Sequence, residues 1–255
     1  MQLSLALDPD PPLARVRDRL LRVFGPQRDG KRHDPTSQSV KSLLSSRTRD
    51  ATSQAAYERV ESSVPSWNAI PDRRPTELVA LIHDVTFAPE KAVNLVAAAD
   101  AIRAHRGSFD LTFLADWPPD LAQSWLQRLR GIGPKTSAAI VNFSTLRQRA
   151  LVVDTHCRRV AIRLGLLPPK ASFGRAYRGL MRLVPDAWDA DDLYELHRLM
   201  KLLGQHRCTH AKPRCPGCPL RDLCAYGRHP EPQHGRARRN ARSDARRSRP
   251  VPRVY

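Results

Sequence analysis

The sequence predicts an all-α fold, and three observations support this prediction. Apolar residues recur every three or four positions along most of the chain, as they do on one face of a helix. No segment shows the apolar–polar alternation of a half-buried strand. Prolines and glycines stand at the ends of the periodic segments, where helices begin and end. With 255 residues, the chain can form one large domain or two small ones.

Apolar spacing places five helices in the first half of the chain. They are expected over residues 13–24, 39–60, 77–85, 89–105 and 120–130. A charged segment over 29–35 follows the first helix and is typical of a linker. The second helix carries apolar residues from Val40 to Val60, and the third follows a capping pair that begins at Pro75. The fourth ends before Gly107.

Four further helices are expected in the second half. Their ranges are 134–146, 154–164, 172–184 and 191–203. Pro134 opens the first of them, and Gly165 and Gly204 are expected to end the second and the fourth. After Tyr226 the composition is dominated by Arg, Pro, Ser and Ala, which cannot bury enough apolar surface to fold. We therefore expect a disordered tail over 228–255.

The formal net charge of +18 implies either a polyanionic partner or a sticky basic tail. The tail contributes nine arginines against Glu231 and Asp244, but the rest of the chain is also strongly basic. A basic body with a basic tail fits nucleic acid better than a membrane surface, and no apolar run is long enough to cross a bilayer. The first seven residues lack the basic start of a signal peptide, so we expect a cytoplasmic protein.

The segment 126–140 predicts two helices joined by a very tight hairpin. One helix stops at Gly131 and a new helix starts after Gly133. The side chain of Ile132 between them is expected to be buried and so to anchor the turn to the core. Glycine is expected at both positions because the turn demands positive φ or a close backbone approach. The N–H groups at the turn and helix start, up to Thr136, would cradle a DNA phosphate. The alternative is an ordinary glycine cap followed by a proline-started helix.

Lys135 lies in the first turn of the second hairpin helix. The helix dipole is unfavourable to a cation there, and nearby arginines would add to the repulsion. Both effects lower the pKa of a lysine, and a partly neutral lysine is a nucleophile. The alternative is a solvated surface lysine.

Asp154 follows an apolar segment and precedes a helix. It fits the N-cap of that helix, and a capping carboxylate can also face a cleft. Taken alone, its position favours the structural role, and the two roles are compatible.

Four of the five cysteines crowd into seventeen residues near the C-terminus, whereas Cys157 stands alone. An odd count without a secretory signal favours a metal site over a disulfide framework. Four thiolates suit either zinc or a [4Fe–4S] cluster. A zinc site usually offers two close pairs of cysteines, whereas this segment has only one, and this favours iron–sulfur. His206 and His210 leave a mixed zinc site open. The four cysteines are Cys208, Cys215, Cys218 and Cys224.

Three segments together resemble the endonuclease III branch of the helix-hairpin-helix base-excision glycosylases: 129–136, 153–156 and 212–224. The resemblance covers roughly residues 13–226, and the cysteine spacing matches the family throughout, which implies a [4Fe–4S] cluster. It implies a two-domain helical protein with double-stranded DNA in the cleft between the domains. The implied parts are an N-terminal extension (1–12), a first helix with its linker (13–35), a six-helix barrel domain (36–147), an iron–sulfur domain (148–227) and the basic tail (228–255).

The resemblance also implies an activity. Lys135 stands where the family keeps its nucleophile, and Asp154 where it keeps its catalytic carboxylate. We therefore expect a bifunctional DNA glycosylase and AP lyase, which excises oxidised bases, pyrimidines above all, and cleaves the strand by β-elimination. It is expected to act as a monomer on the nucleoid. The alternatives are a monofunctional mismatch or adenine glycosylase and a non-catalytic DNA-binding module.

Two residues depart from the family pattern. Arg47 stands where a glutamine commonly fills the gap left by the flipped base, and Phe87 where a leucine commonly intercalates. Each has a simpler alternative, as a surface arginine and as a core phenylalanine. Lys212 and Arg214 in the cysteine loop are expected to meet phosphates, and the basic tail to tether DNA or only to aid solubility.

Overall fold

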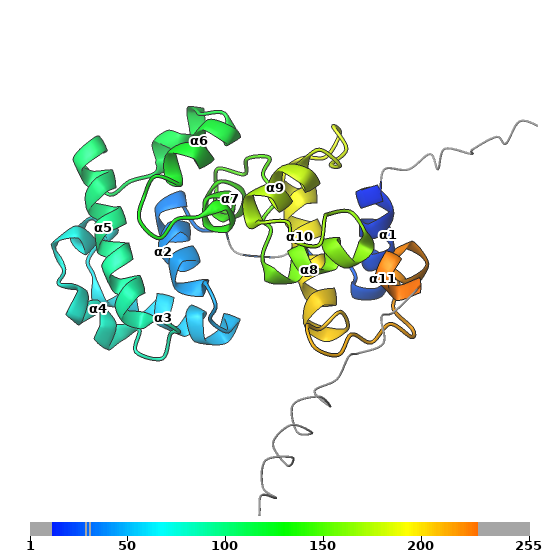
Figure 1. Cartoon of the computed structure of the whole chain (residues 1–255). Coiled ribbons are helices and arrows are strands. Elements are labelled where there is room, and N and C mark those ends of the chain that lie inside the picture. The colour runs from blue at the N-terminus through cyan, green and yellow to red at the C-terminus, as the bar shows by residue number, and fades with distance from the viewer. Residues whose placement is uncertain (1–11, 29, 31, 229–255) are drawn as a thin grey trace, which may run out of the picture.

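The computed structural model describes residues 12–28, 30 and 32–228, and this part of the chain is helical (Figure 1). The described residues form no β-strand; an isolated bridge joins His33 and Ser144. The all-α prediction is therefore confirmed. The expected N-terminal extension and basic tail lie outside the described residues, apart from Pro12 and Arg228. The α-helices are α1 (Pro12–Phe24), α2 (Pro35–Ser45), α3 (Asp50–Ser63), α4 (Pro75–Leu81), α5 (Ala88–Arg106), α6 (Pro119–Leu126), α7 (Pro134–Phe143), α8 (Thr155–Leu164), α9 (Phe173–Met181), α10 (Ala190–His206) and α11 (Ala225–Arg228).

Three short 3₁₀ helices complete the described fold, and none of them was predicted from the sequence. They are η1 (Trp67–Asp72), η2 (Thr112–Asp116) and η3 (Arg221–Leu223). Such short turns bury few residues and leave no apolar periodicity in the sequence. None of the helices formed by the described residues is both long and apolar enough to cross a lipid bilayer.

The single helix expected over 39–60 is wrong, because the chain forms two helices there. α2 ends at Ser45 and α3 begins at Asp50. The residues between them are all polar, so a continuous helix would gain no apolar burial over that turn. Arg47 adopts a left-handed conformation, with φ of 54°. The expected linker is also one residue too long, since Asp34 caps α2 by accepting hydrogen bonds from the backbone of Thr36 and Ser37.

The expected end of the last long helix at Gly204 is also wrong. α10 continues to His206, and Gly204 is buried within it. A β-carbon at Gly204 would lie 2.7 Å from Cβ of His156, so the glycine permits close packing of α8 against α10. Here glycine serves packing rather than termination.

The buried apolar residues form two clusters. The first core runs from Val40 to Val152 and is built mainly by α2–α7. The second combines Leu13, Val16 and Leu20 of α1 with residues 151–220. Figure 1 shows α2–α6 on one side and α1 beside α10 and α11 on the other, with α7 between them.

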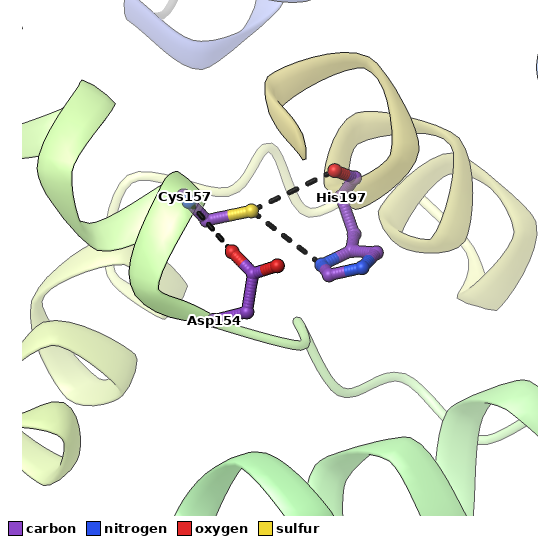
Figure 2. A group of neighbouring side chains, drawn as sticks. All are labelled: Asp154, Cys157 and His197. Atoms are coloured by element: carbon purple, nitrogen blue, oxygen red, sulfur yellow. Dashed lines mark hydrogen bonds between the residues drawn. The ribbon is translucent and has the colours of Figure 1, made fainter. Parts of the chain in front are cut away.

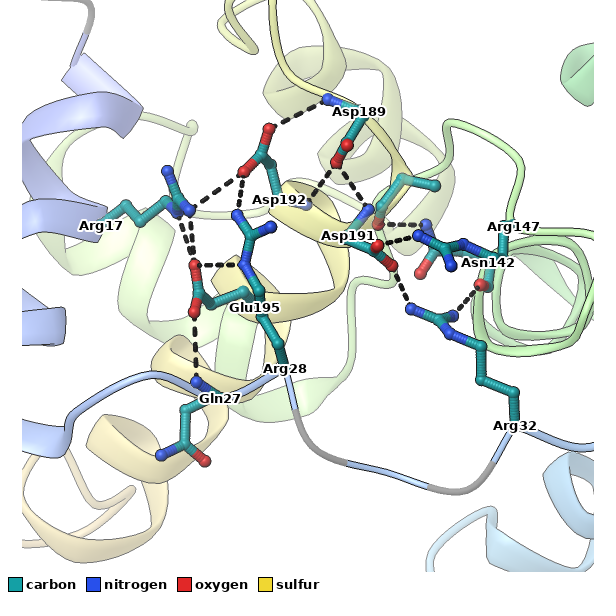
Figure 3. A network of polar contacts seen from close by, with 11 residues as sticks. Arg17, Gln27, Arg28, Arg32, Asn142, Arg147, Asp189, Asp191, Asp192 and Glu195 are labelled. Atoms are coloured by element: carbon teal, nitrogen blue, oxygen red, sulfur yellow. Dashed lines mark hydrogen bonds and ion pairs between the residues drawn. The ribbon is translucent and has the colours of Figure 1, made fainter.

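Ion pairs between arginines and carboxylates near the start of α10 hold α1 and two connecting segments against this helix (Figure 3). Glu195, with a side chain only 2% exposed, pairs with Arg17 of α1 and accepts a hydrogen bond from the Gln27 amide at 3.1 Å. Asp191 pairs with Arg32 and Arg147, from the segments before α2 and after α7. A buried carboxylate requires such partners. The network thus fixes both connecting segments on α10.

Candidate active site

Lys135 lies in the first turn of α7, as the sequence predicts, and is partly buried. Its Nζ donates a hydrogen bond to Oγ of Ser45, at the end of α2, over 3.0 Å. Burial lowers the pKa of Lys135, and the charge of Lys201 lowers it further, whereas Asp154 and Asp50 act in the opposite direction. The net result is a pKa below the usual 10.5, so this amine loses its proton more readily than an ordinary lysine.

Asp154 is the N-cap of α8, and its Oδ1 accepts a hydrogen bond from the Cys157 amide at 2.7 Å. Burial alone would raise the pKa of Asp154, but His197 and the hydrogen bond from Cys157 outweigh it, and the pKa falls below its usual 3.8. The carboxylate is therefore charged near neutral pH. Its charge acts on Lys135, so the structure brings the two expected catalytic residues within electrostatic reach of each other.

Cys157 and His197 lie next to Asp154 (Figure 2). His197 Nδ1 lies 2.8 Å from the carbonyl oxygen of Val152, to which it donates, and the Cys157 thiol donates to the His197 carbonyl at 3.6 Å. Burial lowers the pKa of His197 to about 4 despite the opposing effect of Asp154, so the ring is neutral at pH 7. The two residues thus hold the segment that ends in Asp154.

The same three side chains could in principle hold a metal ion, since their ligand atoms lie within 4.8 Å of one another. The hydrogen bonds indicate a different role. Nδ1 of His197 carries a hydrogen because it lies so close to the Val152 carbonyl, and Asp154 already caps α8. We therefore interpret these three residues as a hydrogen-bonded group that positions the Asp154 carboxylate, and not as a metal site.

An ion pair that links the two cores lies close enough to Lys135 to affect the pKa of this lysine. Nζ of Lys201 in α10 binds both carboxylate oxygens of Asp50 in α3, each at 2.8 Å. This pair and Ser45, like His197, were not found from the sequence. No short motif links them, because they come from helices that only tertiary packing brings to Lys135.

The hairpin between α6 and α7 has the expected shape, with one correction. Gly131 has φ of 80°, and a β-carbon there would lie 2.8 Å from Cβ of Asn94. Ile132 is buried, as expected. Gly133, however, has φ of −99° and room for a β-carbon, so the expected conformational requirement is wrong at that position. Thr136 is buried, whereas Gly133 is exposed.

Arg47 and Phe87 both lie at the surface, on two loops. Phe87 is 53% exposed, which excludes the alternative of a core phenylalanine. The guanidinium carbon of Arg47 lies 5.7 Å from the centroid of the Phe87 ring. The two residues that depart from the family pattern therefore form one exposed cation–π pair.

The four C-terminal cysteines line one cavity, together with Arg163, Arg207, Arg214 and other residues. Burial and the neighbouring sulfurs raise the pKa of the Cys218 thiol. Two sulfurs already accept hydrogen bonds, Cys208 from Arg163 at 3.3 Å and Cys224 from the Gly227 amide at 3.2 Å. Four cysteines that line one cavity, two of them with hydrogen-bond donors to their sulfurs, are compatible with a four-thiolate site, whereas His206 and His210 do not line the cavity. Lys212 and Arg214 are exposed on the same loop.

A comparison with protein families matches residues 40–186, more than half of the chain, to the HhH-GPD superfamily of base excision DNA repair proteins. The chain belongs to this superfamily. The match spans the hairpin, Lys135 and Asp154, and it confirms the family predicted from the sequence. Membership of the HhH-GPD superfamily also accounts for the helical architecture.

Similar proteins and structures agree with this placement. The chain is 30% identical over 194 residues to the DNA glycosylase/AP lyase ROS1 of Arabidopsis thaliana, covering 70% of this chain but only 14% of that much longer protein. It is 27% identical over 201 residues to endonuclease III of Sulfolobus acidocaldarius, covering 77% of this chain and 84% of the relative. A solved non-covalent endonuclease III–DNA complex shares the fold, with a TM-score of 0.70 and 24% identity over 85% of this chain and 95% of that one.

Proposed function

We propose that this HhH-GPD protein is a bifunctional DNA glycosylase and AP lyase that removes oxidised bases, pyrimidines above all, from duplex DNA. One observation carries the proposal: Lys135 is partly buried, bonded to the neutral hydroxyl of Ser45, and has a lowered pKa within reach of the Asp154 charge. A lysine amine that is uncharged part of the time is a nucleophile. The names of the relatives, a DNA glycosylase/AP lyase and an endonuclease III, agree with this chemistry.

DNA binding precedes the chemistry. The exposed backbone around Gly133 and the start of α7 bind a phosphate, because helix N-termini favour anions. This contact fixes the duplex without reading its sequence. The damaged nucleotide leaves the base stack, since C1′ of its sugar cannot be reached inside a duplex. Arg47 and Phe87 occupy the space that the nucleotide vacates.

The neutral amine of Lys135 then attacks C1′. The bond from C1′ to the base breaks and the base leaves with the electron pair. Opening of the sugar ring, in which the C1′–O4′ bond breaks and O4′ takes up a proton, gives a protonated Schiff base between C1′ and Nζ. Loss of a proton from C2′ expels the 3′ phosphate and cleaves the strand, and water finally hydrolyses the Schiff base to release Lys135.

Asp154 contributes charge. Its carboxylate, ionised near neutral pH, stabilises the positive charge that develops on the sugar as the base departs. It also accepts the proton that Lys135 loses on attack, directly or through water. His197 and Cys157 keep the carboxylate at the start of α8 while this charge changes.

A [4Fe–4S] cluster would be held by Cys208, Cys215, Cys218 and Cys224. The fact that all four line one cavity supports this assignment. When bound, the cluster would fix the loop in a single conformation. The loop's exposed Lys212 and Arg214 would then meet a DNA phosphate. The chemistry at C1′ requires only the protein side chains.

Borohydride trapping on a duplex with an abasic site tests the proposal. The wild-type protein should form a covalent adduct, and Lys135→Gln should not. Lys170→Gln is the matched control, because Lys170 is an exposed lysine outside the site. If the wild type forms no adduct, the protein is not a lyase. An adduct that survives in Lys135→Gln would assign the nucleophile to another residue.

A further inference from the structure

Arg47 and Phe87 lie on separate loops but form one exposed tip. Arg47 belongs to the loop between α2 and α3, and Phe87 immediately precedes α5. Both have positive φ, 54° and 60°, which non-glycine residues seldom adopt. Such a conformation persists only where surrounding contacts impose it. The tip therefore needs a support, and the support lies beneath it.

That support is Lys91, a lysine in the first turns of α5 that is only 7% exposed. Its Nζ donates to the carbonyl oxygens of Leu44 at 2.6 Å and Ser46 at 2.5 Å, and to Oγ1 of Thr48 at 3.0 Å. An ammonium group has three N–H donors, so these three acceptors satisfy it completely. The acceptors lie on both sides of Arg47.

Lys91 also connects to the other half of the tip. Its backbone N–H donates to the carbonyl of Phe87 at 3.0 Å, the first backbone hydrogen bond of α5, so the helix that carries Lys91 starts directly at Phe87. Oγ1 of Thr48 accepts a second hydrogen bond from the amide of Thr86, next to Phe87, at 3.3 Å. One lysine and one threonine thus join the two loops.

The choice of a lysine at this site is informative. The salt bridges formed among residues 12–228 do not include Lys91, and its three side-chain acceptors are uncharged. Burying an ammonium group without a paired carboxylate costs stability, which an apolar side chain of similar length would avoid. Burial accordingly lowers the pKa of Lys91 to about 8. The benefit of the lysine lies in ordering the loop carbonyls.

We propose that Lys91 is a positioning residue, which holds Arg47 and Phe87 side by side before DNA binds, so that the two side chains enter the duplex as one preassembled wedge. This inference rests on the proposed function, because it assumes that the tip fills the gap left by a flipped nucleotide. An aromatic ring stacks on any base, and a guanidinium offers only donors. Ordering both in advance reduces the entropy lost on binding.

The test measures binding to a duplex with a tetrahydrofuran abasic-site analogue, which cannot be cleaved, and to the same duplex without a lesion. A 2-aminopurine opposite the analogue reports wedge insertion by its fluorescence. Lys91→Met, which keeps the aliphatic stem, should weaken binding to the abasic duplex about tenfold and reduce the fluorescence change. Binding to the undamaged duplex should change less than about twofold. Lys170→Met is the matched control, since Lys170 is exposed and distant in sequence from both loops.

The decisive comparison adds Lys91→Met to a protein that already carries Arg47→Ala and Phe87→Ala. If Lys91 acts through the tip, the third substitution should weaken binding no further. A full additional loss would overturn the proposal, as would equal losses for both duplexes. Thr48→Val, which removes only the hydroxyl, should give a smaller loss of the same kind, and it decides the question if Lys91→Met fails to fold. If the wild type prefers the abasic duplex and neither substitution weakens that binding, the positioning role alone is overturned. If the wild type shows no preference for the abasic duplex, the proposed function is contradicted as well.

Discussion

Lys201 of α10 holds both carboxylate oxygens of Asp50 of α3 at 2.8 Å, and this ion pair joins the two cores within electrostatic reach of Lys135. A second cation near a lysine disfavours its protonated form. Asp50 offsets part of that effect, so the pair adjusts the pKa of Lys135, which burial and Asp154 influence more strongly, and it also bridges the two cores.

Replacement of Lys201 by methionine should shift the pH dependence of Schiff-base trapping to higher pH. Lys201 lowers the pKa of Lys135, so its removal takes away that effect. It also leaves the carboxylate of Asp50 without its partner, and that carboxylate raises the pKa of Lys135. Trapping at pH 7 should therefore slow severalfold and recover in alkali. Single-turnover trapping rates between pH 6 and 9.5 measure the shift, with Lys170→Met as control. A shift to lower pH would show that Lys201 does not depress the pKa of Lys135.

Asp154→Asn should separate charge from capping. Asparagine caps a helix as well as aspartate does, so the melting temperature should stay nearly constant. Base excision should slow by about 10²-fold through loss of the carboxylate. Because Asp154 raises the pKa of Lys135, its removal should also move the trapping profile to lower pH. An unchanged melting temperature together with unchanged activity would mean that Asp154 is only a cap.

His197 should make the protein sensitive to acid. Burial lowers its pKa from 6.5 to about 4, so between these pH values the unfolded chain binds a proton that the folded protein excludes. The free energy of unfolding should fall as the pH drops from 6.5 to 4, by about 3 kcal/mol from this group. His197→Gln should lose less stability over that range in urea titrations. Parallel acid curves for both proteins would contradict the lowered pKa.

The two hairpin glycines should respond differently to alanine. Gly131→Ala forces a side chain into positive φ and against Asn94, and should cost about 1–3 kcal/mol of stability. Gly133→Ala has space and an ordinary φ, so stability should change by less than about 0.5 kcal/mol. If the backbone there binds a phosphate, Gly133→Ala should still weaken DNA binding. Thermal unfolding and DNA titration distinguish these outcomes.

The cysteine cavity should bind iron. The purified protein should contain about four irons and absorb visible light, as a [4Fe–4S] cluster requires. Cys218→Ser should lose the iron, whereas Cys157→Ser, which alters a buried thiol outside the cavity, should keep it. Metal analysis of the two variants gives the comparison. Stoichiometric zinc without iron would replace the cluster by a tetrahedral zinc site.

Local sequence patterns predicted much of this molecule. The helices and the hairpin follow from apolar spacing and from proline and glycine at helix ends. The helix break after Ser45 was missed because its carbonyls are bound by Lys91 from another helix, a contact that leaves no periodic signal. Gly204 was misassigned because packing against His156 decides its role.

The candidate site divides in the same way. The sequence singles out Lys135 and Asp154 as candidates because each stands at a helix start within a short motif. Ser45, Lys201 and His197 approach them from α2 and α10, so only the packing of distant helices reveals them. The exposure of Phe87 likewise depends on the fold, since an apolar residue in a sequence is more often buried.

The composition of the two cores has a consequence for the order of folding. The buried residues of the first core all come from the segment 40–152, so this core can form while the rest of the chain is still being synthesised. The second takes Leu13, Val16 and Leu20 from α1 but needs helices beyond residue 155 to cover them. α1 therefore leaves the ribosome before α10, and its apolar stripe stays uncovered until α10 follows. During that interval the uncovered apolar stripe favours aggregation of the nascent chain.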